Sequence, residues 1–304
     1  MRVVVSGSSG LIGQAVVAAL RSRGDEVTLL VRRAPRPGEA AWDPPARSID
    51  AGAIGEADAV VHLAGAGIGD KRWSGARRHE IVSSRVQSTA LLARTLAELS
   101  NRPAVLVSAS AVGYYGDRGD EELTEDSGPG DGFLADVCRA WEGAAEPAVA
   151  AGVRVVALRS GVVLSAHGGA LARQLPLFRA GVGGRLGSGR QWLSWISLAD
   201  EVAVILRCLD DPSLQGPLNA TAPAPVTNRE FTGALGRALH RPAVLAVPGV
   251  ALRVALGSDL ASEMVLAGQR VLPAKLTAAG FPFDHAEIGT ALEALFAPGA
   301  PRRG

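Results

Sequence analysis

The first thirteen residues place a short apolar run directly before three glycines that are spaced three positions apart. Residues 3–5 are all valine, and Gly7, Gly10 and Gly13 follow before an amphipathic stretch begins. This order predicts a buried strand, a tight turn and a helix. The first glycine permits the turn, the second lets the backbone approach a pyrophosphate, and the third lets helix and strand pack closely. Because the free N–H groups at a helix start attract phosphate, we interpret the turn as a dinucleotide site, with a ligand-free βα turn as the alternative.

Two arginines follow the second predicted strand. That strand covers residues 26–31 and ends at Arg32 and Arg33, and no acidic residue occurs between Glu26 and Glu39. An NAD site usually has an Asp or Glu here that accepts from the ribose 2′-OH, whereas an arginine suits the 2′-phosphate of NADP. Guanidinium groups also bind phosphate bidentately. The pattern therefore predicts NADP(H) as the cofactor, with a solvated basic strand end as the alternative.

Composition argues against several other classes of protein. The 304 residues carry a net charge of +1, which provides no electrostatic reason to expect nucleic acid or an anionic membrane as a partner. No apolar run reaches the roughly 18 residues that a membrane-spanning helix needs. The first strand begins at once, so we expect no signal peptide. Cys138 and Cys208 are the only cysteines and lie far apart, so we expect neither a disulfide framework nor a metal site, and a cytoplasmic protein.

Strand-like and helix-like stretches alternate through the first half of the chain. After the opening strand and helix, apolar runs occur at 59–63, 104–107 and 153–158, and helical spacing occurs at 84–99 and 134–149. Such alternation is typical of right-handed βαβ units with a parallel sheet. It predicts an α/β fold, a Rossmann-type doubly wound parallel sheet.

The pattern loosens after about residue 165. Five glycines occur in residues 181–189, which we interpret as a loop, and Thr227 and Glu230 form a capping box that opens a helix through Leu239. We predict an NADP-binding Rossmann domain over residues 1–165 plus about 191–211. A smaller α/β substrate lobe over 166–190 and 212–304 is expected to cover the carboxyl edge of the sheet, where open α/β sheets bind ligands.

Several short segments, spread over nearly the whole chain, resemble those of one known family. They are Lys71-Arg72-Trp73, Ser84-Arg85, Trp141-Glu142, Leu158 to Leu164, Gly187 to Trp192, Trp195-Ile196 and Gly268 to Pro273. The chain resembles the extended short-chain dehydrogenases/reductases, and within them a branch of NADP-dependent "epimerase family" proteins that has its own C-terminal module.

The resemblance implies which residues hold the cofactor. It assigns the phosphate turn, the 2′-phosphate end, the edge of the third strand, an acid–base pair on the following helix and one contact near the nicotinamide. The implied cofactor-binding residues are, in that order, Gly7, Gly10, Leu11, Ile12 and Gly13; Arg32 and Arg33; Leu63, Ala64 and Gly65; Glu80 and Arg85; and Val163. From the residues alone, Glu80 and Arg85 would be only a polar pair on a helix. His62, at the end of an apolar strand, is interpreted as a structural residue.

The acid–base pair of ordinary superfamily members is missing. Those members use Tyr-x-x-x-Lys, but Tyr114 and Tyr115 are the only tyrosines here, and the residues four positions on are Arg118 and Gly119. When Glu142 is aligned with the acid that usually follows the motif, Leu134 and Cys138 fall in the two catalytic places. We interpret Cys138 as a small apolar core residue.

Few residues can replace that pair. Ser108 and Ser110 end the strand where the superfamily keeps a hydrogen-bonding serine, and Tyr114 follows, with Arg118 near enough in sequence to stabilise a phenolate. We predict Ser110 and Tyr114 as the catalytic residues that polarise the substrate oxygen, with an aromatic pocket wall as the alternative for Tyr114. The acidic run over 117–126 is interpreted as a solvated loop, in which Glu125 is a candidate to face the pocket.

The sequence therefore predicts an NADP(H)-dependent oxidoreductase or epimerase that acts on a small carbonyl or sugar-type substrate. The alternative is an NADPH-binding redox sensor or regulatory protein with little or no turnover, which the missing catalytic pair favours. Fold analogy alone does not choose between the two. A nucleic-acid-binding or structural protein has little support, because the phosphate turn and Arg32 are intact.

Overall fold

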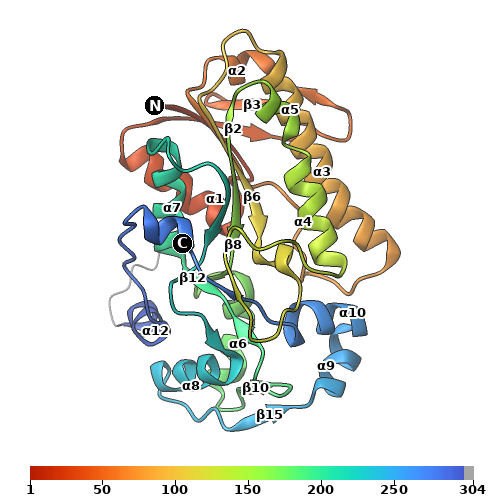
Figure 1. Ribbon diagram of the computed structural model, residues 1–304, viewed down its shortest axis with the longest axis vertical. Coiled ribbons are helices and arrows are strands. Elements are labelled where there is room, and N and C mark those ends of the chain that lie inside the picture. The colour runs from red at the N-terminus through yellow and green to blue at the C-terminus, as the bar shows by residue number, and fades with distance from the viewer. Residues whose placement is uncertain (298–304) are drawn as a thin grey trace. The chain divides into compact units, whose positions relative to one another are not determined.

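A computed structural model describes residues 1–297, which form two compact units (Figure 1). Unit 1 contains residues 1–114, 136–159 and 202–218. Of the described residues, unit 2 contains 115–135, 160–201 and 219–297. The boundaries given above for an NADP-binding domain and a substrate lobe stay a prediction.

Unit 1 is built around a mostly parallel sheet of eight strands, in the order β13-β8-β6-β5-β1-β2-β3-β4. The strands are β1 (Arg2–Ser6), β2 (Glu26–Val31), β3 (Glu39–Asp43), β4 (Ser48–Ile49), β5 (Ala59–His62), β6 (Val105–Ala111), β8 (Arg154–Ser160) and β13 (Gly216–Ala220). Strand β1 pairs in parallel with both β2 and β5, so the strand order reverses there. This is the switch point at which doubly wound sheets bind nucleotides, and the predicted fold class is confirmed.

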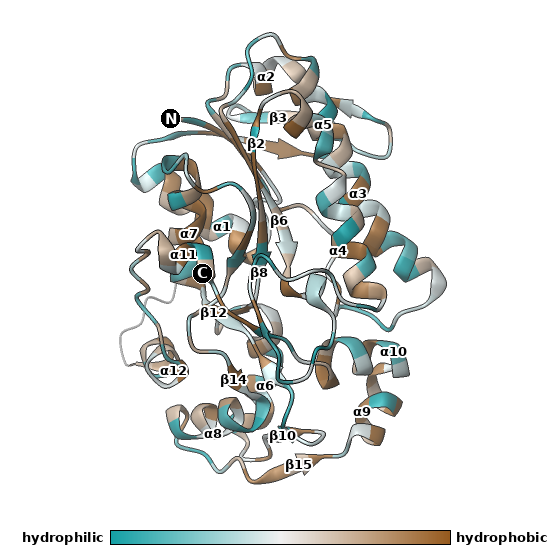
Figure 2. Cartoon of the chain, in the orientation of Figure 1, coloured by the Kyte–Doolittle hydropathy of each residue, from teal (hydrophilic) through white to brown (hydrophobic). Residues whose placement is uncertain are grey.

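Helices cover both faces of this sheet. They are α1 (Leu11–Ser22), α2 (Ala51–Gly55), α3 (Gly75–Glu98), α4 (Phe133–Gly143), α5 (Glu146–Ala150) and α7 (Leu198–Asp210). Figure 1 shows α3, α4 and α5 along one face and α1 and α7 along the other. Valines of β1 and β5 pack with leucines of α3 in the core, and Figure 2 shows strand β2 as strongly hydrophobic. Burying each such side chain contributes about 1.5–3 kcal/mol.

Two helices differ from the sequence prediction for local reasons. Helix α3 begins at Gly75 rather than residue 84, because the Ser74 hydroxyl accepts a hydrogen bond from the Arg77 N–H at 3.2 Å and caps the helix. The predicted helix over 134–149 is broken into α4 and α5. Pro147 stands in the first turn of α5, and its ring would clash with the Gly143 carbonyl in a continuous helix.

Unit 2 contains four two-stranded pairs and several short helices. The pairs are β10–β15, β11–β14, β12–β9 and β16–β7. These strands are β7 (Glu122–Leu123), β9 (Val162–Leu164), β10 (Gly184–Leu186), β11 (Trp192–Leu193), β12 (Trp195–Ser197), β14 (Val226–Thr227), β15 (Leu245–Val247) and β16 (Arg270–Val271). The glycine-rich segment over 181–189 thus contains a strand, β10, rather than being loop throughout.

Three helices of unit 2 contribute to a second apolar core, namely α6 (Gly169–Arg179), α8 (Asn228–Ala238) and α12 (Ile288–Phe296). The other described helices of this part of the chain are α9 (Gly249–Leu256), α10 (Ser258–Leu260), a π-helix (Ala261–Leu266) and α11 (Ala274–Ala278), and a 3-10 turn (Val112–Tyr115) precedes them all. Phe178, Trp195 and Phe231 are buried together in that core. The predicted capping box is confirmed at the start of α8, where Thr227 and Glu230 bind each other's backbone N–H groups. None of the helices in residues 1–297 has the length and apolar character needed to cross a bilayer.

Candidate functional site

The glycine turn joins β1 to α1 at the switch point of the sheet. Gly7 has φ +72°, which side chains disfavour, and a Cβ there would lie 2.6 Å from the Leu63 carbonyl carbon. A Cβ on Gly13 would clash with the backbone of Gly7. At Gly10, by contrast, an added Cβ would meet only the Gly7 oxygen, at 3.4 Å. Gly7 and Gly13 are therefore required by the chain's own packing, whereas Gly10 is exposed and leaves space above the turn.

The start of α1 retains free donors beside that space. Gly10 is the N-cap residue, and within residues 1–297 no side chain caps the helix. Leu11 and Ile12 form the first turn, which contains no acidic residue. Uncapped N–H groups and the positive end of the helix dipole make this turn an anion site.

The two arginines after β2 differ sharply in their surroundings. Arg33 makes a bidentate ion pair with Glu39, with N–O distances of 2.5 and 2.7 Å. The contact raises the pKa of Arg33 and, together with the Arg36 N–H, lowers that of Glu39. Arg32 is exposed and, among the described residues, takes part in no hydrogen bond or ion pair. Only Arg32 therefore presents an uncommitted guanidinium at the carboxyl end of β2.

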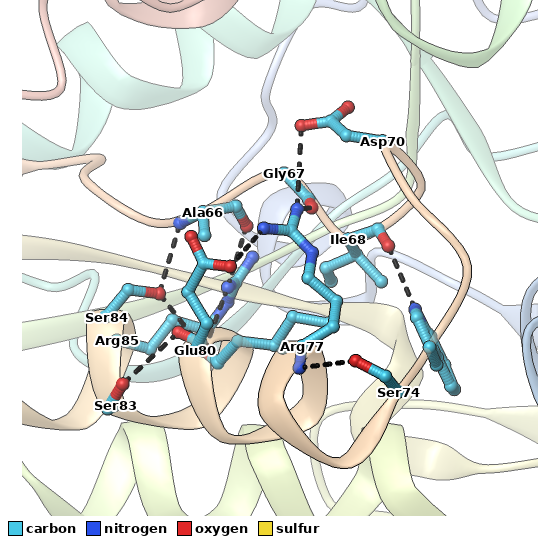
Figure 3. A network of polar contacts seen from close by, with 12 residues as sticks. Ala66, Gly67, Ile68, Asp70, Ser74, Arg77, Glu80, Ser83, Ser84 and Arg85 are labelled. Carbon is cyan, nitrogen blue, oxygen red and sulfur yellow. Dashed lines mark hydrogen bonds and ion pairs between the residues drawn. The ribbon is translucent and has the colours of Figure 1, made fainter.

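Helix α3 holds the loop that follows β5 (Figure 3). Leu63 and Ala64 are half-buried and Gly65 is exposed, where a Cβ would lie 3.3 Å from the Arg85 guanidinium carbon. Arg85 donates to the Ala66 carbonyl at 2.9 Å, and Arg77 donates to the Gly67 carbonyl. The loop beside the glycine turn is thus fixed by two arginines from one helix.

Glu80 and Arg85, the acidic and basic residues predicted on α3, lie in different surroundings. Arg85 is buried, stacks on Trp141 at 4.9 Å, and burial lowers its pKa to about 10. Glu80 is 58% exposed and accepts from Arg77 at 2.6 Å. Arg85 therefore holds the loop, while Glu80, although paired with Arg77, is accessible to a ligand from solvent. Contact of either residue with a cofactor stays a prediction.

The remaining predicted cofactor contact lies in unit 2. Val163 is half-buried in β9 and pairs with Ile196 of β12 in a parallel register. Its contact with a nicotinamide stays a prediction.

His62 lies in a buried polar network beneath the turn. Its Nδ1 is 2.6 Å from the Ser6 hydroxyl, and its Nε2 is 3.0 Å from the Thr89 hydroxyl, which also accepts from the Trp141 indole at 3.0 Å. Burial lowers the pKa of His62 to about 4. His62 thus joins β1, β5 and α3 as a neutral imidazole, consistent with its interpretation as a structural residue.

The places of the missing catalytic pair hold no proton-transferring group. The Leu134 N–H donates to Glu263 at 2.8 Å. Cys138 is buried, its thiol lies 3.7 Å from the Ala111 carbonyl, and burial raises its pKa to about 12. The thiol therefore stays neutral and packs in the core.

Both predicted catalytic residues join a polar cluster nearby in unit 1. Ser110, near the carboxyl end of β6, donates to Glu142 of α4 at 2.6 Å. Arg159, near the carboxyl end of β8, donates twice to the same carboxylate, at 2.8 Å each. Its guanidinium carbon lies 3.4 Å from the centre of the Tyr114 ring. The structure thus brings Ser110 and Tyr114 together through two residues that the sequence analysis did not assign.

Glu142 and Arg159 could have been found from the sequence by their position. Arg159 lies near the end of a mostly apolar strand and Glu142 lies on the amphipathic α4, a pattern that would place each charge near the core, where it needs a partner.

The other polar candidates have structural roles within unit 2. The Tyr115 hydroxyl is buried and donates to Asn219 at 2.7 Å. Arg118 makes a bidentate pair with Glu121 at 2.6 and 2.8 Å, so it is committed to its own loop. Glu125 is buried and accepts from the Asn219 N–H at 3.0 Å, which anchors the backbone.

The sheet order and the glycine turn after its first strand define a Rossmann-like α/β protein of the short-chain dehydrogenase/reductase type. The chain belongs to the NAD dependent epimerase/dehydratase family, whose model matches residues 3–219. A second model, a domain of unknown function (DUF1731), matches residues 247–295. The resemblance predicted from the sequence is confirmed, including the separate C-terminal module.

Close relatives match nearly the whole chain. Epimerase family protein Mb2239 of Mycobacterium bovis is 49% identical over 291 residues, which cover 95% of this chain and 96% of that protein. The crystal structure of human epimerase family protein SDR39U1 (isoform 2) with NADPH is 36% identical, with a TM-score of 0.89, and the match covers 97% of this chain and 99% of that one. A nucleoside-diphosphate sugar epimerase from Corynebacterium glutamicum is 39% identical, with a TM-score of 0.79. That match covers 97% of this chain and 58% of that one.

Proposed function

We propose that this protein is an NADP(H)-dependent oxidoreductase or epimerase that acts on a small carbonyl or sugar-type substrate. The observation that carries the proposal is the uncommitted Arg32 at the carboxyl end of β2, in the same unit as an uncapped glycine turn. A cation at this position suits a 2′-phosphate, whereas NAD sites place a carboxylate here. The NADPH in the human relative's structure supports the same cofactor.

The proposed cofactor site uses the turn for the pyrophosphate and Arg32 for the 2′-phosphate. Gly10 leaves room for the phosphates, and the first N–H groups of α1 are available to bind them. Arg77 and Arg85 hold the loop at Leu63 to Gly67 in place, and the exposed Glu80 is available as an acceptor for a ribose hydroxyl. The cofactor would supply hydride exchange with the substrate carbon.

The substrate class is drawn from the family and from the half-buried Tyr114. The family is described as epimerases and dehydratases, and one relative is described as a nucleoside-diphosphate sugar epimerase. A phenol beside a buried arginine suits a substrate with a carbonyl or hydroxyl group that exchanges a proton.

Cofactor affinity in matched arginine variants tests the proposal. We expect wild-type protein to bind NADPH more tightly than NADH in titration calorimetry. Arg32→Ala should lower NADPH affinity about ten- to a hundred-fold, because a charge-assisted contact contributes roughly 1.5–3 kcal/mol, and should leave NADH affinity unchanged. Arg33→Ala is the matched control, since both terminal nitrogens of Arg33 already donate to Glu39. Equal affinity of the wild type for the two dinucleotides would refute the cofactor assignment.

A second candidate function is an NADPH-binding sensor with little turnover. Leu134 and the neutral thiol of Cys138 in the places of the usual catalytic pair favour it. Tight NADPH binding without turnover of any aldehyde, ketone or sugar nucleotide would favour the sensor over the enzyme.

A further inference from the structure

The proposed enzyme lacks the cation that its superfamily normally places beside a proton-transferring tyrosine. That cation is the lysine of Tyr-x-x-x-Lys, and Cys138 occupies its place. A replacement for that cation is needed only if the protein is an enzyme, and so its assignment rests on the proposed function.

Arg159 is the cation that lies against a tyrosine in this unit. Its guanidinium carbon is 3.4 Å from the centre of the Tyr114 ring, and the residue is 3% exposed. A guanidinium is planar and always charged, so it can stack on a phenol in a way that a lysine ammonium cannot. Because Arg159 is buried, water screens its charge little, while the Glu142 carboxylate offsets part of it.

Two further residues fix Arg159 in that position. Arg159 donates hydrogen bonds from Nε and Nη2 to the Glu142 carboxylate, at 2.8 Å each, and these two bonds set the plane of the guanidinium. Ser110 donates to the same carboxylate at 2.6 Å, so Glu142 is held from β6 as well as from β8. Ser110 is 5% exposed and its proton is committed to Glu142, whereas Tyr114 is half-buried. Glu142 is half-buried too, but its carboxylate accepts from both Arg159 and Ser110, so of these four residues we assign Tyr114 to the substrate.

We propose that Tyr114 transfers the proton and that Arg159, positioned by Glu142 and Ser110, supplies the positive charge that lysine supplies elsewhere in the superfamily. In carbonyl reduction, NADPH would supply the hydride that adds to the substrate carbon, while the Tyr114 O–H bond breaks and its proton passes to the carbonyl oxygen. Arg159 offsets the charge of the resulting phenolate, and water returns a proton to it. Ser110 is then a positioning residue rather than the group that polarises the substrate oxygen.

Two substitutions at Arg159 separate the effect of its positive charge from the effect of its bidentate contact. The full-length protein is saturated with NADPH and assayed by loss of nicotinamide absorbance with a panel of aldehydes, cyclic ketones and o-quinones. Tyr114→Phe and Arg159→Met should each lower kcat by about 10²–10⁴-fold, with KM and NADPH affinity unchanged. Arg159→Lys keeps the charge without the bidentate contact and should recover at least about ten-fold over Arg159→Met. Arg139→Met, an exposed arginine on α4, is the matched control and should leave kcat unchanged.

A double-mutant cycle distinguishes this role from simple packing. In a Tyr114→Phe background, Arg159→Lys should lower kcat no further, because its effect acts through the phenol. This variant pair also carries the test if Arg159→Met fails to fold. Equal kcat for Arg159→Lys and Arg159→Met, a silent Tyr114→Phe, or full additivity in the cycle would overturn the inference. A wild type that binds NADPH but turns over no member of the panel would also overturn it, while leaving the cofactor assignment standing. A wild type that does not bind NADPH would refute the proposed function itself.

Discussion

Two buried titratable residues should make opposite contributions to stability between about pH 5 and pH 7.5. Burial lowers the pKa of His62 from 6.5 to about 4, and burial raises that of Glu201 from 4.5 to about 7. Glu201 is fully buried in unit 2; one carboxylate oxygen accepts from Ser160 at 2.6 Å, and the other has no partner among the described residues. Each shift changes the number of protons bound on unfolding, and so makes stability depend on pH.

The sign differs for the two groups. As pH falls from 6.5 to about 4, His62 binds a proton in the unfolded state but not in the folded state. The contribution of His62 to stability that is present above this pH range is therefore lost. As pH rises from 4.5 to about 7, unfolded Glu201 releases a proton that the folded protein retains, so the stability present below that window is lost. Between about pH 7.5 and pH 5, His62 should lower the free energy of unfolding by about 2 kcal/mol and Glu201 should raise it by a similar ~2 kcal/mol. The two contributions nearly cancel in the wild type.

Single substitutions should expose each contribution. The free energy of unfolding is measured in urea at about pH 5, 6 and 7.5 for wild type, His62→Gln and Glu201→Gln. From pH 7.5 to 5, the glutamine at 62 should raise stability relative to wild type by about 2 kcal/mol, and the glutamine at 201 should lower it by about as much. Variants whose stability runs parallel to the wild type at all three values would refute the argument from burial.

Two further predictions concern the proposed cofactor site. Gly10→Val should fold normally and lose NADPH binding, because its side chain enters the space for the pyrophosphate. Gly13→Ala should instead lower the melting temperature, because its Cβ meets the backbone of Gly7. Normal NADPH affinity of Gly10→Val in calorimetry would show that the turn binds no phosphate. Glu39→Gln should weaken the hold on Arg33 and raise the NADPH-to-NADH affinity ratio several-fold; an unchanged ratio in the same titration would place Arg33 out of reach of the 2′-phosphate.

The features that could be predicted from the sequence are those whose cause lies within a few residues. The glycine spacing after residues 3–5 determines the turn, because Gly7 has a positive φ and a Cβ on Gly13 would meet the backbone of Gly7. The Thr227 capping box determines the start of α8 in the same way. The alternation of strands and helices predicted the parallel sheet, since βαβ units have one handedness. The break in the predicted helix over 134–149 was missed, although Pro147 was the signal for it.

Tertiary structure decided which of the similar residues are available for chemistry. Arg32 and Arg33 are equivalent in the sequence, and only the position of Glu39 on the neighbouring strand separates them. Arg118 is closer than Arg159 to Tyr114 in the chain, yet Arg159 lies over the ring because β6 and β8 are neighbours in the sheet. Local sequence determines backbone conformation through steric and capping effects that span a few residues. Side-chain partners depend on distances that exist only after distant strands have packed.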